Sequence, residues 1–201
     1  ISCSDVHPTS DNLFSYGMSK GTLRIGDLRT SSNAQKNGIS FGESVNHKNY
    51  IYELLANFTG VKFIKGGKNL VTRDCLSVKI WDICNPKKPI STIMLNDGIK
   101  SKSANGRKLA IFDKFGLRSS ADGNSILTGS YNNNFHLVDP SDGSNWQYEL
   151  NYKNATMVKQ ITKGGAISRM DYGLKTIAGD FNPRKNLMAV ASKNCFFTYS
   201  M

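Results

Sequence analysis

The chain repeats one pattern four times, and this repeat limits its possible folds more than any other feature. Four windows of 14 residues align without gaps, and each holds a short apolar strand, a polar turn and a second strand. The windows are FSYGMSKGTLRIGD (14–27), NLVTRDCLSVKIWD (69–82), ILTGSYNNNFHLVD (126–139) and LMAVASKNCFFTYS (187–200). Four similar structural units are therefore expected along the chain.

A further strand and turn precede each window. In each case a short predicted strand is followed by Pro or Gly with Asn, Asp or Lys, which form tight turns. These segments are SDVHPTSDN (4–12), GVKFIKGGK (60–68), FGLRSSADGN (115–124) and AGDFNPRKN (178–186). Each unit is thus predicted to contain three strands joined by hairpin turns.

Long polar insertions separate the units. The windows end at residues 27, 82, 139 and 200, so their ends are 55, 57 and 61 residues apart. This exceeds the roughly 40–45 residues of a compact WD repeat. The excess lies in stretches rich in Ser, Asn, Gly and Lys at 29–50, 84–108 and 151–169. The predicted units are 1–50, 51–110, 111–175 and 176–201.

The Trp81-Asp82 pair points to one architecture. In a β-propeller, four-stranded sheets called blades pack face to face around an axis, so their middle strands are apolar on both faces. Trp81 would close the third strand of a blade, and Asp82 would begin the turn to the outer strand. The other windows end in Gly26-Asp27, Val138-Asp139 and Tyr199-Ser200. The sequence predicts an all-β WD-repeat propeller of about four blades over residues 1–201; an unrelated β-sandwich is the alternative.

The predicted ring is incomplete. The fourth unit ends at Met201 directly after its third strand, and Ile1 leads at once into the first strand of a unit. Propellers commonly close by taking a strand from the other terminus, and neither end supplies one. We therefore expect a fragment that forms an open arc. In isolation it should self-associate, because unpaired strand edges and uncovered apolar faces attract other chains.

Charge and cysteine content narrow the classes of function. The chain has 26 Lys and Arg against 15 Asp and Glu, a net charge of +11, which favours acidic or phosphate-bearing partners. No apolar run reaches the roughly 18 residues that a membrane span requires. The four cysteines lack the paired spacing of a zinc site. We predict a soluble protein with no metal and a cytoplasmic location, with the nucleus as an additional one.

We expect no enzyme activity, no catalytic residue and no cofactor. The sequence lacks the HExxH motif of zinc proteases and the GxxxxGK[ST] loop that binds phosphates. The repeat accounts for His7 in a first-strand turn and for His136 within an alternating strand.

The predicted register places two sets of loops on one rim of the propeller, where such proteins bind partners. One set joins second to third strands at 18–20, 73–75, 130–133 and 192–194, and the other leads into first strands at 50–52 and 111–114. The predicted binding residues are Tyr50, Ile51, Arg73, Asp74, Lys114, Tyr131 and Asn132. Apolar anchors would supply binding energy and charged residues would select partners. Alternatively, Arg73 and Asp74 brace their blade, and Tyr131 packs against the next one.

Four phrases of the sequence resemble one family. SKGTLRIGDLR (19–29), VTRDCLSVKIWD (71–82), IFDKF (111–115) and LTGSYNNNFHLVD (127–139) are similar to the WD-repeat B-family regulatory subunits of protein phosphatase 2A, in the order expected of that family's carboxy-terminal half. The resemblance extends over essentially the whole chain.

The resemblance implies blades four to seven of a seven-bladed ring, in a noncatalytic subunit that binds a helical-repeat scaffold and the catalytic subunit. It also implies that the subunit recruits and orients phosphoprotein substrates, in a groove near Tyr50, Ile51 and Asp74. The family's amino-terminal half, with the hairpin that grips the scaffold, is missing from this sequence. The alternative function is a basic WD-repeat module that binds RNA or another acidic partner, since its lysine-rich loops also carry Tyr and Phe.

Overall fold

The computed structural model describes residues 1–18, 21–30, 38–42, 56–95, 113–151, 156–160 and 171–200. These residues form β-strands and one short 3-10 turn, and they include no α-helix. None of them belongs to a helix long and apolar enough to cross a membrane. The chain divides into two compact units, Ile1–Met94 and Leu95–Met201, and each is described by itself.

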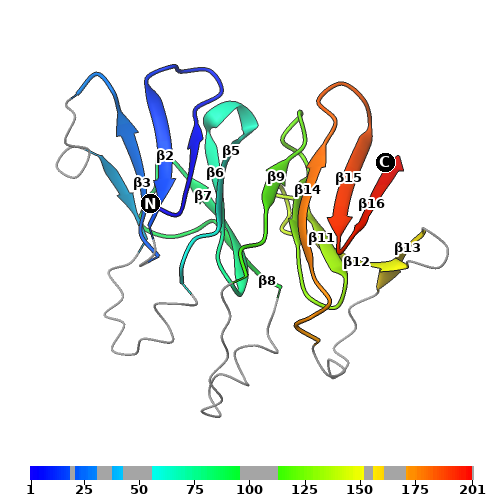
Figure 1. Ribbon diagram of the computed structural model, residues 1–201. Helices are drawn as coiled ribbons and strands as arrows, with labels where there is room; N and C mark the ends of the chain where they lie inside the picture. The colour runs from blue at the N-terminus through cyan, green and yellow to red at the C-terminus, as the bar shows by residue number, and fades with distance from the viewer. Residues whose placement is uncertain are drawn as a thin grey trace, which may run out of the picture. The chain divides into compact units, whose positions relative to one another are not determined.

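Unit 1 contains two four-stranded antiparallel sheets (Figure 1). Sheet 1 runs in chain order through β1 (Cys3–Val6), β2 (Leu13–Gly17), β3 (Leu23–Asp27) and β4 (Ile39–Phe41). Sheet 2 does the same through β5 (Gly60–Ile64), β6 (Asn69–Arg73), β7 (Ser77–Asp82) and β8 (Ser91–Met94). The 3-10 turn η1 (Lys65–Gly67) joins β5 to β6.

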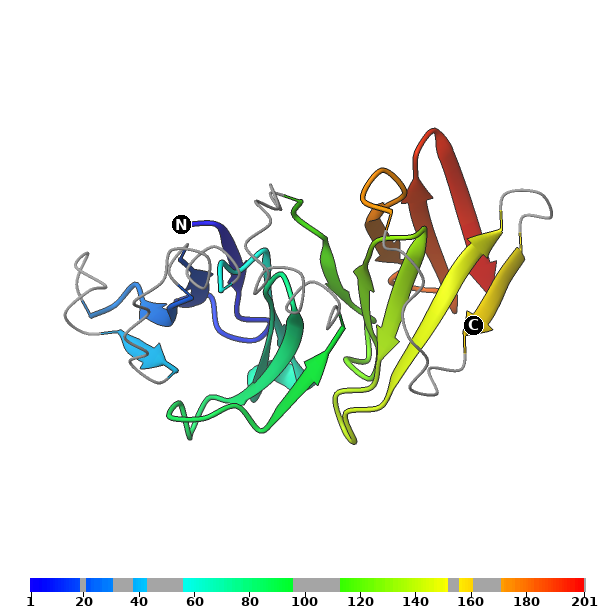
Figure 2. The same ribbon diagram turned by 90° about the horizontal axis from the view of Figure 1, so that it is seen from below.

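Unit 2 contains a five-stranded and a three-stranded antiparallel sheet (Figures 1 and 2). Sheet 3 is made of β9 (Leu117–Ser119), β10 (Ile126–Gly129), β11 (Asn134–Val138), β12 (Asn145–Asn151) and β13 (Thr156–Gln160). Sheet 4 is made of β14 (Thr176–Phe181), β15 (Leu187–Ser192) and β16 (Cys195–Ser200).

The four predicted repeats correspond to the four sheets. Each window covers the second and third strands of one sheet, and the segment before it supplies the first strand. The four expected repeats and their hairpins are therefore confirmed, whereas the exact blade boundaries stay a prediction. One difference is β13, which lies in the expected insertion 151–169 and pairs with β12 from Asn151↔Thr156 to Gln147↔Gln160. The β-branched residues of this short segment suit a strand, but it has no counterpart in the repeat.

The aspartate that ends three of the windows has a clear local role. In Asp27, Asp82 and Asp139 the Oδ1 atom accepts the backbone N–H of the residue two positions later, at 2.9, 2.8 and 2.7 Å. A short carboxylate makes this turn without help from distant residues. At Asp27 the side-chain hydrogen bond from Arg29 also lowers the pKa of the carboxyl group to about 2. The predicted turn is thus present at the end of the third strand in sheets 1, 2 and 3.

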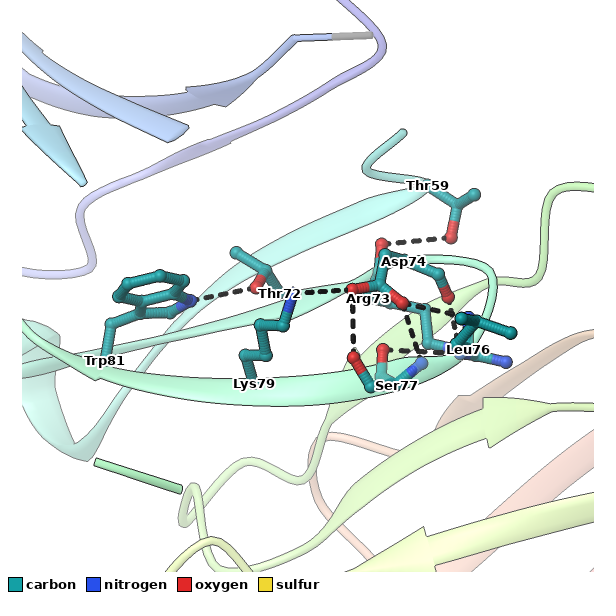
Figure 3. Close-up of polar contacts among 8 residues, drawn as sticks. All are labelled: Thr59, Thr72, Arg73, Asp74, Leu76, Ser77, Lys79 and Trp81. Carbon is teal, nitrogen blue, oxygen red and sulfur yellow. Dashed lines mark hydrogen bonds and ion pairs between the residues drawn. The ribbon is translucent and has the colours of Figure 1, made fainter. Parts of the chain in front are cut away.

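Apolar side chains of the two sheets fill the core of unit 1. Its buried members are Leu23, Ile25, Phe41, Phe58, Val61, Phe63, Leu70 and Trp81. Trp81 is 4% exposed, and its ring meets Phe41 of sheet 1 edge to face with centroids 5.9 Å apart. The indole N–H donates to Thr72 Oγ1 at 2.9 Å, so its polar atom is satisfied inside the core (Figure 3).

Sheets 3 and 4 form the corresponding core of unit 2. Its buried members are Leu127, Phe135, Leu150, Phe181, Met188, Val190, Phe197 and Tyr199. Phe135 is fully buried and stacks with Tyr148 and Tyr199, with centroids 5.3 and 6.3 Å away. A Cβ on Gly129 would lie 1.9 Å from the carbonyl oxygen of Thr176, so only glycine allows this approach of β10 to β14.

Trp81→Ala tests the core of unit 1. The change removes a buried ring that contacts both sheets and leaves Thr72 without its indole donor, so the free energy of unfolding should fall by about 3–5 kcal/mol. Urea unfolding followed by circular dichroism measures it. Ile90→Ala is the control, because Ile90 is 61% exposed and its loss should have little effect. Equal effects of the two changes would contradict the proposed role of Trp81.

Candidate partner-binding rim

The second-to-third-strand turns of unit 1 meet the segment that leads into β5. A Cβ on Gly21, in the turn between β2 and β3, would lie 3.0 Å from Ala56. The backbone N–H and the hydroxyl of Thr59 both donate to the carbonyl oxygen of Arg73, at 2.7 and 3.3 Å. The loops of the two sheets in unit 1 therefore gather at one end, as the repeat predicts.

Asp74 organises the turn between β6 and β7 (Figure 3). Its Oδ1 accepts the backbone N–H groups of Leu76 and Ser77 at 2.9 and 2.7 Å. Its Oδ2 accepts the Ser77 hydroxyl at 2.9 Å and forms an ion pair with Lys79 Nζ at 2.9 Å. Asp74 is only 4% exposed. Its carboxylate is therefore committed to shaping the turn.

Arg73 braces the same turn from inside the sheet. The residue is fully buried, and its Nη1 donates to the backbone carbonyl oxygens of Asp74 and, at 3.3 Å, of Ser77. A guanidinium group suits this position because it offers several donors in one plane. The contacts agree with the bracing alternative for Arg73 and Asp74. A direct role of either residue in binding stays a prediction.

In unit 2, Tyr131 joins the loops that lead into β9 and β14. The residue is 2% exposed, and its hydroxyl donates to Asp113 Oδ2 at 3.1 Å. Lys175 Nζ forms an ion pair with the other oxygen of Asp113. The Tyr131 ring contacts Phe115 and Tyr172 edge to face, with centroids 4.9 and 5.1 Å away. This is the packing against the neighbouring sheet that the sequence left as an alternative to binding.

Asn132 and Lys114 flank this cluster. Asn132 has a φ of +58°, a value that Asn tolerates better than most residues, and its Oδ1 accepts the backbone N–H of Asp171 at 2.7 Å. Lys114 is exposed. Of the predicted binding residues within the described ranges, Lys114 is therefore the best placed to reach a partner.

Five of the seven predicted binding residues lie within the described ranges, and they are divided between the two units. Arg73 and Asp74 lie in unit 1, and Lys114, Tyr131 and Asn132 lie in unit 2. Tyr50 and Ile51 are outside the described residues. Arg73, Asp74, Tyr131 and Asn132 lie at turns between second and third strands, and Lys114 lies in the segment before β9. The binding role of all seven residues stays a prediction.

Asp113 and Lys175 were not among the predicted binding residues. They are 62 residues apart and join the loops before β9 and β14. Both residues precede a first strand. The expectation that loops before first strands lie on the rim, which led to Lys114, therefore also covers them. Asp113 lies within the predicted loop 111–114, whereas 171–175 was not among the predicted loops.

One enzyme-like spacing also escaped the sequence analysis. Residues 38–42 read GISFG, which has the GxSxG spacing of a nucleophile elbow. That motif needs its serine on a sharp turn between a strand and a helix. Ser40 instead lies within β4, opposite Arg24 of β3, so the spacing lacks the required context.

Asp74→Ala should destabilise unit 1 more than Lys79→Ala. Loss of the carboxylate leaves buried backbone N–H groups without their acceptor, at a cost of about 3 kcal/mol. Lys79 keeps 29% of its side chain exposed, so loss of its screened ion pair should cost no more than about 1 kcal/mol. Chemical unfolding measures both variants. The reverse order would show that the ion pair, not the turn, is the main function of Asp74.

Curated proteins include relatives that are similar to this chain along its whole length. It is 31% identical over 220 residues to the serine/threonine-protein phosphatase 2A regulatory subunit phr2AB of Dictyostelium discoideum, covering 100% of this chain and 45% of that protein. It is 29% identical to the protein phosphatase PP2A 55 kDa regulatory subunit of Drosophila melanogaster, covering 99% and 43%. The beta isoform of the 55 kDa regulatory subunit from Carassius auratus is also 29% identical, with 99% and 48% covered. The chain thus spans about half the length of these relatives.

Solved structures give the fold. Raptor of Chaetomium thermophilum superposes with a TM-score of 0.62 at 15% identity, over 99% of this chain and 15% of that one. The Cps50 (Swd1) β-propeller domain of Myceliophteria thermophila gives a TM-score of 0.56 at 13% identity, over 100% and 53%. No protein-family model matches the chain. The predicted WD-repeat β-propeller fold is confirmed, and along its whole length the chain is a sequence relative of the 55 kDa, B-family regulatory subunits of protein phosphatase 2A.

Proposed function

We propose that this chain is part of a noncatalytic regulatory subunit of protein phosphatase 2A, which recruits phosphoprotein substrates and orients them toward the catalytic subunit. The observation that carries the proposal is the similarity of the whole chain to regulatory subunits from three organisms. Its partners would be the helical-repeat scaffold and the catalytic subunit. The cytoplasm or the nucleus would be its location.

The rim geometry supports this function. In both units, turns between second and third strands contact the segments before first strands. Loops held on rigid sheets are the usual place for binding residues. Because the Asp74 side chain is buried in its own turn and the Tyr131 side chain is buried against the loops before β9 and β14, they would fix the shape of the surface. Exposed neighbours such as Lys114 would then make the contacts.

Affinity capture tests the proposal. The tagged chain is incubated with a purified complex of the scaffold and catalytic subunits, and retention of the catalytic subunit is measured together with dephosphorylation of an added phosphoprotein. Retention with altered substrate preference is expected. Absence of retention, combined with binding of an RNA oligonucleotide that weakens steeply with salt, would instead favour the basic RNA-binding alternative.

Lys114→Glu should weaken capture of an acidic phosphoprotein by about three- to tenfold, because reversing a charge at an interface turns attraction into repulsion. Lys185→Glu is the matched control: Lys185 is also exposed, and the two variants have the same net charge. Binding is measured by surface plasmon resonance. If both variants weaken binding equally, total charge rather than the rim accounts for the effect.

We further propose that isolated copies of the chain associate through β16. Within the described residues no strand pairs with the outer edge of β16, and Phe196 on this strand is 68% exposed. An unpaired edge beside an exposed aromatic ring favours pairing with another copy. Light scattering should give a mass that rises with concentration, and Phe196→Glu should reduce this rise. A constant monomer mass for the unaltered chain would contradict the proposal.

A further inference from the structure

A pocket of about 530 Å³ opens between the two sheets of unit 1. Five of its lining residues are large and apolar: Leu13, Ile25, Ile39, Phe63 and Ile83. Such a volume is within the range of about 300–1,000 Å³ that small-ligand pockets occupy. Ile39 is 44% exposed, so part of the apolar wall is accessible from solvent.

The pocket lies at the far end of the sheets from the candidate rim. Its lining includes Asn69, where β6 begins, and Asp82, where β7 ends. The turn between β6 and β7 is at the opposite end of these two strands. A ligand in the pocket and a partner on the rim would therefore contact different ends of sheet 2.

Close backbone packing gives one wall of the pocket a defined shape. The His7 ring meets Phe63 edge to face, with centroids 4.9 Å apart. A Cβ on Gly67 would lie 2.0 Å from His7 Nε2, and Gly67 has a φ of +93°. Only glycine suits both the space and the backbone at this position. The wall is thus built from the first-strand turn of sheet 1 and the η1 turn of sheet 2.

The charged groups around the pocket favour a negative ligand. Lys68 lines the pocket and is exposed, and Lys65 is exposed in the adjoining turn. Among the described residues, no ion pair joins Lys68 to a carboxylate. Asp82 is the one carboxylate among the described residues that line the pocket, and its Oδ1 accepts the backbone N–H of Cys84 at 2.8 Å. The chain as a whole carries a net charge of +11.

We propose that this pocket binds a short acidic segment of a partner protein. One branched or aromatic side chain of the segment would enter between Ile39 and Phe63, and a neighbouring carboxylate would pair with Lys68. Apolar anchors supply most of the energy in such contacts, and complementary charge selects the partner. This surface is separate from the rim, and the inference does not depend on the proposed role in phosphatase regulation.

Three labelled peptides test the chemistry of the ligand with the complete 201-residue chain. The peptide EDLFDE carries both features, EDSSDE lacks the apolar anchor, and KKLFKK reverses the charge. Fluorescence anisotropy should show binding of EDLFDE, with at least about tenfold weaker binding of the other two, because each lacks one of the two contributions. No binding of EDLFDE at millimolar concentration, or equal binding of all three, would overturn the proposal.

Two pairs of variants test the location. Ile39→Asp should weaken EDLFDE binding by about tenfold or more, whereas Ile177→Asp should not. The two side chains are matched, since they are 44% and 45% exposed and both lie in strands. Lys68→Glu should also weaken binding, and Lys185→Glu, with the same net charge, should not. Circular dichroism checks that each variant is folded. Equal effects within either pair would assign the binding to another surface.

Cysteine reactivity gives a second readout that needs no mutation. Cys84 lines the pocket, and both Cys84 and Cys195 are free and exposed. Bound EDLFDE should slow alkylation of Cys84 by iodoacetamide and leave that of Cys195 in unit 2 unchanged, as followed by mass spectrometry. An unchanged rate at Cys84 with saturating peptide would exclude occupancy of the pocket.

Discussion

Packing between the apolar faces of neighbouring sheets supports everything else in this protein. A four-stranded sheet with apolar residues on both faces is not stable by itself in water, because each face must be covered. In unit 1, Trp81 and Phe41 meet across the two sheets, and in unit 2 Phe135 of sheet 3 stacks with Tyr199 of sheet 4. These contacts hold the strands whose ends carry the loops of the candidate rim.

The turns depend on this packing but are stabilised locally. Asp27, Asp82 and Asp139 each accept a backbone N–H two positions later, and Asp74 satisfies two such groups together with a hydroxyl and an ammonium group. Since the polar groups of these turns are satisfied within the chain, the turns can keep one shape. A partner would then meet a preformed surface, which lowers the entropic cost of binding.

The rim and the pocket between sheets 1 and 2 differ in a way that suits different ligands. At the rim, most of the aromatic and charged side chains described above contact other residues of the chain. Tyr131, for example, contacts Asp113, Phe115 and Tyr172. Among the described residues, few charged side chains of these loops, such as Lys114, are left exposed. The pocket instead leaves apolar side chains and Lys68 accessible, which suits a single inserted side chain.

The sequence by itself determined the repeat, the order of the strands and the aspartate turns, because these depend on patterns within about 30 residues. It did not determine which residues of the predicted rim loops are buried. Arg73 looks like a surface residue in sequence, yet it is fully enclosed, and Tyr131 packs on residues from two separate loops. The Asp113–Lys175 ion pair, the pairing of β13 and the pocket join residues whose proximity only the packing of whole strands and sheets decides. Local periodicity specifies a strand. The burial of its side chains and the residues they contact depend instead on how the neighbouring sheet packs against it.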